Sequence, residues 1–330
     1  MPLALVFGLA AGLASAVVFA SATTGPAVMR LLLFFLTPLP IYLAGLVHGW
    51  RAALLGVASG TLLIALLTRP EAGLMFAVCE GLPAAALVYL ATLYRSSGPI
   101  PSPAGVEWYP VVRIVLWAAV IGAVLAVISL LKIGGDRDAI VASLKTIIAS
   151  FVKKEVSASG TPVPLDDKTL ESLAETTLAL LPAFSAAMWT AGHLLNLWLA
   201  GRVASASGHL ARPWPDIAGF SLPPKLPIAL AAAALASFVD GNLGFVASAY
   251  AGALTFAYAL LGIAIIHYVT RGLPWRPFAL STLYASFVIL NIVPLVGAAL
   301  LGLADALKPL RRRPPGVGGQ PPPAPPTSIV

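Results

Sequence analysis

The residue of this chain best suited to chemistry is Glu80, a carboxylate near the middle of a hydrophobic stretch that runs from Ala72 to Tyr94. An acidic side chain in hydrocarbon costs at least ~2.5 kcal/mol, so it usually faces the protein interior or a water-filled cavity. Two interpretations follow from this cost. Glu80 either binds a substrate or a proton, or is a protonated carboxyl group that hydrogen-bonds to another helix.

Few polar side chains lie at a comparable depth in the other hydrophobic stretches. The candidates to accompany Glu80 are His193, Asn196, His267 and Asn291. His193 and Asn196 are three residues apart and therefore share one helix face, whereas His267 lies close to Arg271 near a helix end. We predict Glu80, His193 and Asn196 as ligand-binding residues around a cavity of roughly a few hundred cubic ångströms.

The sequence that follows Glu80 weakens the helix that carries it. Gly81 and Pro83 lie within three residues of the carboxylate, and proline lacks the backbone N–H that a helix needs. We therefore expect backbone carbonyls to be freed here, and such carbonyls can line a polar pocket within a membrane protein.

Motifs of familiar enzyme classes are missing from the sequence. It has no His-Glu-x-x-His, no Gly-x-Ser-x-Gly, no paired aspartates within the apolar stretches and no Gly-x-x-x-x-Gly-Lys-Ser/Thr phosphate loop. The single cysteine, Cys79, allows neither an intrachain disulfide nor a Cys-rich metal site. We expect no catalytic residues, no metal and no cofactor, so active transport would need an energising partner or an ion gradient.

The first apolar stretch carries a stripe of small residues at every fourth position, Ala4, Gly8, Gly12 and Ala16. Small residues at this spacing let two helix backbones approach closely in lipid. The stripe is a predicted helix-docking surface, and its partner is either another span of this chain or a separate subunit.

The elements that must position these residues are membrane-spanning helices. Hydrophobic residues make up 59% of the 330 residues and charged residues only 10%, and a spanning helix needs ~20 predominantly apolar residues. We predict an all-α, polytopic transmembrane bundle of about nine spans. They are Leu3–Ser21, Leu31–Val47, Ala52–Leu67, Ala72–Tyr94, Val111–Leu131, Leu181–Val203, Leu226–Val239, Phe245–Val269 and Phe278 to about Leu307.

The net charge of +7 comes mainly from Lys and Arg that sit singly at the ends of spans, which argues against nucleic acid as a partner. Cytoplasmic loops are enriched in these residues, and the pattern predicts a cytoplasmic N-terminus. The last span is interrupted by Asn291 and Pro294. If it is broken or re-entrant, the basic residues Lys308 and Arg311–Arg313 return to the cytoplasmic side.

Four segments are predicted along the chain: transmembrane helices in 1–131, an extracytoplasmic amphipathic insert in 132–180, transmembrane helices in 181–310 and a disordered Pro/Gly-rich cytoplasmic tail in 311–330. Within the insert, apolar residues from Ile140 to Val152 recur at helical spacing. Asp166 or Asp167 is a predicted cap for a second helix that continues into the sixth span. The insert is either a lid over a site or a packing cap.

Short motifs with a family resemblance recur along most of the chain. They are Pro38-Leu39-Pro40 through Gly45 to Gly49, Leu82-Pro83, Asn196 with Arg202, Arg212 to Asp216, Leu222-Pro223, His267, Thr270-Arg271-Gly272, Pro274-Trp275 and Gly302 to Asp305. Together they resemble the YybS-like bacterial membrane proteins, catalogued as a domain of unknown function. That family is distantly similar to the S-components of energy-coupling-factor vitamin transporters, which are six-span bundles.

The resemblance implies that the first six spans form the S-component-like half. In S-components a small-residue face on the first helix docks the coupling subunit, and Ala4, Gly8, Gly12 and Ala16 are the matching positions. The long insert before the sixth span departs from that pattern. We expect an integral membrane protein that binds a small ligand or assists transport, with a lipid-embedded partner on the first helix. The alternative is a non-transporting scaffold of the cell envelope.

Overall fold

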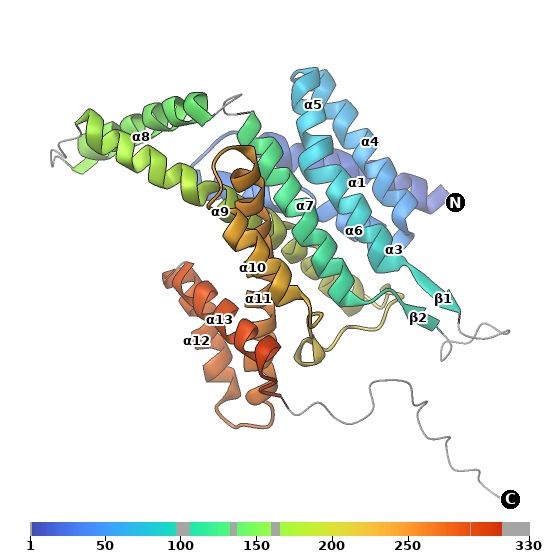
Figure 1. Ribbon diagram of the computed structural model, residues 1–330. Coiled ribbons are helices and arrows are strands. Elements are labelled where there is room, and N and C mark those ends of the chain that lie inside the picture. The colour runs from blue at the N-terminus through green and yellow to red at the C-terminus, as the bar shows by residue number, and fades with distance from the viewer. Residues whose placement is uncertain (1, 97–105, 133–136, 160–165, 291, 312–330) are drawn as a thin grey trace, which may run out of the picture.

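The computed structural model describes residues 2–96, 106–132, 137–159, 166–290 and 292–311. Almost every described element is a helix, which confirms the predicted all-α membrane bundle (Figure 1). Seven helical segments are long and apolar enough to cross a bilayer. The predicted tail, from residue 312 onward, lies outside the described residues.

The first half of the chain forms short helices broken at proline and glycine. Its elements are α1 (Pro2–Ser21), α2 (Ala27–Leu36), α3 (Leu39–His48), α4 (Trp50–Leu67), α5 (Pro70–Phe76), the π-helix η1 (Ala77–Gly81), α6 (Leu82–Thr92), β1 (Tyr94–Ser96) and β2 (Val106–Trp108). The two short strands pair antiparallel. Their hairpin was not predicted, since three-residue strands leave little pattern in a sequence.

The second half is built on two long helices. Its elements are α7 (Val111–Leu131), α8 (Arg137–Ser159), α9 (Asp167–Ala206), the short 3₁₀ turn η3 (Ile217–Gly219), α10 (Leu226–Ala236), α11 (Asn242–Val269), α12 (Arg276–Ile289) and α13 (Ile292–Leu307). Helix α9 packs against α3 on one side and against α7 and α11 on the other, so it joins the two halves.

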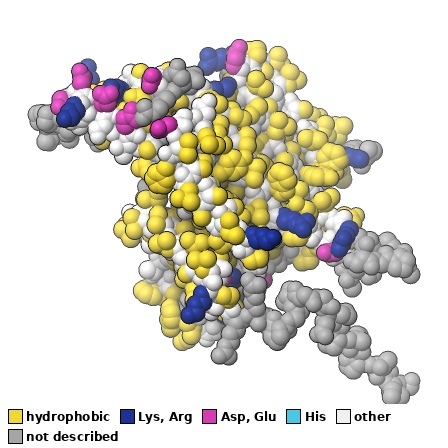
Figure 2. Space-filling view, viewed as in Figure 1, with side chains coloured by type: hydrophobic (Ala, Val, Ile, Leu, Met, Phe, Trp, Pro, Cys, Tyr) yellow, Lys and Arg dark blue, Asp and Glu magenta, His cyan; other side chains and the backbone are white. Residues whose placement is uncertain are grey.

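Two of the nine predicted stretches do not form a single described helix long enough to cross a bilayer. The stretch expected as the seventh span forms α10, a helix of 11 residues, and at 1.5 Å per residue it is only about 16 Å long, far less than a bilayer core of ~30 Å. The last stretch is broken, as predicted, into α12 and α13. Hydrophobic side chains cover the middle of the visible face, while charged ones gather on α8 and toward the helix ends (Figure 2).

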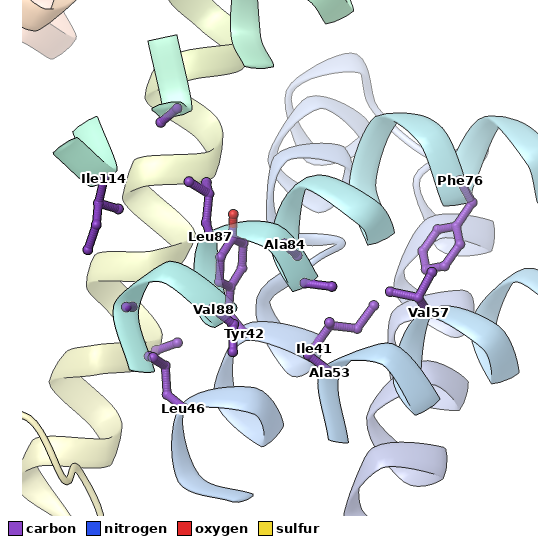
Figure 3. Close-up of a cluster of buried hydrophobic side chains, with 14 of the residues drawn as sticks. Ile41, Tyr42, Leu46, Ala53, Val57, Phe76, Ala84, Leu87, Val88 and Ile114 are labelled. Carbon is purple, nitrogen blue, oxygen red and sulfur yellow. The ribbon is translucent and has the colours of Figure 1, made fainter. Parts of the chain in front are cut away.

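The helices approach one another where small residues face backbone. A Cβ added to Gly12 would lie 2.1 Å from the carbonyl oxygen of Gly56 in α4, and one added to Gly262 of α11 would lie 1.9 Å from that of Ala298 in α13. Such contacts replace the hydrophobic drive that lipid does not supply. The larger buried side chains of the N-terminal half, including Tyr42, Phe76 and Leu87, fill the space between α3, α4 and α6 (Figure 3).

The C-terminal helices return to the end of the bundle where α11 finishes. There Arg311 donates hydrogen bonds to the carbonyl oxygens of Ala218 and Phe220, and the neighbouring Asp216 forms an ion pair with Arg271, just beyond α11. Arg311 and Arg271 therefore lie at one end of the molecule, which is the arrangement that the broken last span predicts.

The insert forms two helices, as its apolar spacing indicates. Helix α8 buries Ile140, Val141 and Leu144 against Ala174 and Leu178 of α9. Asp166 caps α9 by accepting a hydrogen bond from the amide N–H of Thr169 at 2.9 Å. The helix then runs without interruption into the sixth predicted span. Of the two predicted roles, the packing cap matches these contacts.

Candidate ligand-binding site

Glu80 lies inside the bundle and not against lipid. It sits on the π-helix η1 between α5 and α6, and only 3% of its surface is exposed. Its oxygen Oε1 has no hydrogen-bond partner among the described residues. A buried polar atom without a partner carries the cost of its lost hydration, so this carboxyl group is one of the points of the core with an unused capacity to bind.

His193 of α9 is held beside the π-helix by two hydrogen bonds. Its Nε2 lies 3.1 Å from the carbonyl oxygen of Cys79, and its Nδ1 lies 3.1 Å from the hydroxyl of Tyr42 in α3. Because a carbonyl only accepts, Nε2 must carry the proton. In a neutral imidazole Nδ1 then accepts from the tyrosine hydroxyl. The ring of Trp189 stacks on the imidazole with centroids 6.0 Å apart.

The carbonyl of Cys79 is available because of Pro83. In an α-helix this carbonyl would accept from the amide four residues later, and proline at that position has no N–H to give. The chain widens there into a π-helix, in which the amide of Leu82 bonds to the carbonyl of Ala77, five residues earlier. The sequence therefore predicted the freed carbonyl, and the structure identifies His193 as the side chain that bonds to it.

Asn196 lies one turn further along α9 from His193. Its Nδ2 donates to the carbonyl oxygens of Phe35 at 2.5 Å and Gly192 at 2.8 Å. Its side-chain oxygen has no partner among the described residues. The amide thus joins α9 to the end of α2 and leaves one acceptor free in the core.

A small cavity of about 10 Å³ lies beside Glu80 and His193, and its other lining residues are Phe35, Pro38, Trp189 and Gly192. One water molecule needs about 10–15 Å³ of this kind of space. The expected cavity of a few hundred cubic ångströms at Glu80 is therefore wrong for this conformation. The helices α2, α3, η1 and α9 close around the site, because aromatic rings and backbone fill the space between them.

The structure brings some predicted partners to Glu80 and places others elsewhere. His193 lines the same cavity, while His267 bonds through Nε2 to the hydroxyl of Tyr284 at 2.8 Å on the C-terminal helices. Asn291 lies outside the described residues. Sequence reasoning missed Tyr42, although a hydroxyl within an apolar span was a signal, since a buried tyrosine usually finds a hydrogen-bond partner.

The small-residue stripe of α1 faces a helix of the same chain. Ala4 is half-buried and the other three residues are buried. A Cβ on Gly8 would meet the carbonyl oxygen of Ala52 at 2.7 Å, and Ser59 of α4 donates a hydrogen bond to the carbonyl oxygen of Leu9 at 3.1 Å. Of the two predicted partners for the stripe, the structure places an internal one, α4, on it. A separate subunit on the same residues would have to displace α4.

Comparison with known proteins gives one match. A family model described as "Predicted membrane protein (DUF2232)" matches residues 13–306, which is most of the chain. The match supports the resemblance to YybS-like membrane proteins. Neither a curated protein nor a solved structure matches the chain.

Proposed function

This chain belongs to the DUF2232 family of predicted membrane proteins, and from that premise we propose that it is a transport-associated component that binds a small ligand at Glu80. The observation that carries the proposal is the buried carboxyl oxygen of Glu80, which has no hydrogen-bond partner among the described residues and belongs to a residue that lines a small cavity. Ionisable groups inside membranes mark ion and substrate pathways and proton relays.

The size of the cavity limits which ligands can bind there. A volume of about 10 Å³ excludes a vitamin-sized molecule, since sites for such molecules span roughly 300–1,000 Å³. The species that fits without opening the bundle is a proton. We therefore propose that Glu80 takes up and releases a proton, and that a larger ligand would require α9 to move away from η1.

His193, which lines the cavity with Glu80, suits this role because both of its ring nitrogens have hydrogen-bond partners. His193 is held between Tyr42 and the carbonyl of Cys79, so it keeps one orientation beside the carboxyl group. Asn196, one turn further along α9, keeps a side-chain oxygen without a hydrogen-bond partner among the described residues. In this scheme the chain catalyses no reaction of its own, and transport would draw on a proton gradient or on an energising membrane subunit.

The test is infrared spectroscopy of the full chain in lipid nanodiscs, recorded as the difference between two pH values. We expect a carboxylic C=O band that changes with pH in the wild type and is absent in Glu80→Gln. Glu71→Gln is the matched control, because Glu71 lies exposed at the start of the same predicted span, and it should keep the band. If the Glu80→Gln and wild-type difference spectra coincide, Glu80 does not exchange a proton and the proposal fails.

The proposal places the protein in a bacterial inner membrane with its N-terminus and the Arg271 end in the cytoplasm. The support is the position of the basic residues, which the positive-inside tendency assigns to the cytoplasmic side. A reporter fused after Val330 should give a cytoplasmic signal. An extracytoplasmic signal would reject this orientation.

A further inference from the structure

A second hollow lies at the end of the bundle where the basic residues collect, and it shares no lining residue with the Glu80 cavity. It is a groove of about 450 Å³ between α3, the start of α4, the end of α6, the β1–β2 hairpin and the segment around residue 211. The side chains that characterise it are Leu46, Trp50, Tyr89, Tyr94, Trp108 and Arg212. Two of the sequence motifs, the one ending at Gly49 and the one beginning at Arg212, contribute to its lining, whereas the function proposed for Glu80 does not involve it.

Four aromatic side chains form the walls of the groove as two pairs. Trp50 and Tyr89 meet edge to face with centroids 5.8 Å apart, and Tyr94 and Trp108 lie 5.4 Å apart across the hairpin. Tryptophan and tyrosine collect at membrane–water interfaces, where the ring contacts acyl chains and the polar tip reaches the headgroups. Their position at the helix ends places the groove at headgroup depth.

Arg212 is the cation of the groove. Its side chain is half-buried, and burial lowers the pKa of its guanidinium from the usual value. Its hydrogen bond to the carbonyl oxygen of Ala91, at 3.5 Å, is long, and a guanidinium has five N–H donors. A charge that has lost water in this way needs an opposite charge beside it.

No carboxylate of the described residues supplies that charge. The acid nearest to it in sequence, Asp216, pairs with Arg271, and Glu107, which precedes the lining residue Trp108, pairs with Arg95 at 2.6 Å. Arg212 thus points an unneutralised guanidinium at an aromatic groove. A small soluble anion would satisfy the charge but would leave the aromatic walls exposed to water.

We propose that this groove binds an anionic phospholipid. Its phosphate would contact Arg212, and the part of one acyl chain next to the headgroup would lie along Trp50 and Tyr89. Guanidinium and phosphate form paired, charge-assisted hydrogen bonds. Anionic headgroups are attracted to basic pockets on the cytoplasmic side of membrane proteins. The volume suits a headgroup with the first part of one chain, since small-molecule sites span roughly 300–1,000 Å³.

The experiment is native mass spectrometry of the full chain released from nanodiscs that contain phosphatidylglycerol and phosphatidylcholine in equal amounts. We expect the wild type to retain phosphatidylglycerol and Arg212→Gln to retain roughly tenfold less of it, because a hydrogen bond to a charged group is lost. Arg113→Gln is the charge-matched control. Arg113 is exposed at the start of α7 and does not line the groove, so this variant should behave as the wild type does.

A second variant tests whether binding needs the space of the groove as well as the charge of Arg212. Ala211→Trp adds a ring to an exposed residue that lines the groove, so it fills the space while Arg212 remains, and it should also reduce lipid retention. Equal retention by Arg212→Gln and the wild type, or by Ala211→Trp and the wild type, would overturn the proposal. So would displacement of the lipid by inorganic phosphate at equal concentration, because that anion satisfies the charge without using the aromatic walls.

Discussion

Gly12 lies at a close contact between α1 and α4, so substituting it should change the stability of the fold. In Gly12→Ala, the new Cβ would lie 2.0 Å from Oγ of Ser59 and 2.1 Å from the carbonyl oxygen of Gly56. The serine side chain can rotate away, but the backbone carbonyl cannot. Ordinary contact begins near 3.4 Å, so the helices must separate by about 1.3 Å (3.4 − 2.1) at this point.

A gap of that size removes much of the van der Waals attraction along the interface. A gap of ~0.5–1 Å already costs an atom pair a quarter to a half of its attractive energy. It also stretches the hydrogen bond from Ser59 to the carbonyl oxygen of Leu9. We expect Gly12→Ala to destabilise the fold by about 1–3 kcal/mol, the usual cost of overpacking. Gly8→Ala should cost less, because its Cβ would lie 2.7 Å from the nearest backbone oxygen.

The chain offers both a matched control and a built-in probe. A Cβ on Gly297 of α13 meets nothing within 4 Å, so Gly297→Ala makes the same chemical change without a clash. Cys79, the single cysteine, is 4% exposed, so a thiol-reactive fluorogenic dye reports when the core opens on heating. The unfolding temperature should be highest for Gly297→Ala, lower for Gly8→Ala and lowest for Gly12→Ala. If Gly12→Ala unfolds at the same temperature as Gly297→Ala, α1 does not pack on α4 through this stripe.

Three further predictions follow from the hydrogen bonds. Tyr42→Phe leaves Nδ1 of His193 without its 3.1 Å partner and should cost about 1–3 kcal/mol, the penalty for an unsatisfied buried group, in the same dye assay. Arg311→Gln removes the 2.8 Å bond to the carboxylate of Asp305, which is 6% exposed. It should cost about 3–5 kcal/mol as a broken buried pair, and a smaller loss than in Tyr42→Phe would contradict that burial. At Asp216 the hydrogen bond from its arginine partner lowers the pKa. The small stability difference from Asp216→Asn should therefore persist above the unfolded pKa of ~3.9 and vanish as the pH falls through the lower folded value.

Local features of the candidate site followed from the sequence, and its volume did not. Pro83 lacks an N–H wherever the chain goes, so the freed carbonyl of Cys79 was predictable from one residue type. Whether that carbonyl meets a histidine, and whether a ligand-sized void remains beside it, depends on how far α9 approaches the π-helix. That distance is set by Trp189 and Phe35, which line the cavity with Glu80, and no spacing within one helix encodes it.

The same division applies to the groove at the basic end. Its residues come from four separate stretches of sequence between Leu46 and Arg212, and nothing in the sequence links them before the helices pack. Arg212 alone reads as one more basic residue at the end of a span. Its character as a half-buried cation appears only when the acids around it are seen to pair with other arginines.

The sequence by itself determined that this chain is a membrane protein, that its insert is helical and that its last span breaks. It also determined that Glu80 is an acidic residue within a hydrophobic span. These properties follow from composition, periodicity and the fixed backbone chemistry of proline, all of which are local. Only the tertiary structure decided that α4 covers the stripe of α1, that Tyr42 completes the hydrogen bonds of His193 and that the space at Glu80 is closed to all but the smallest ligand. Those outcomes depend on which helices meet and how closely, and the close approach of two helices is a property of both surfaces together.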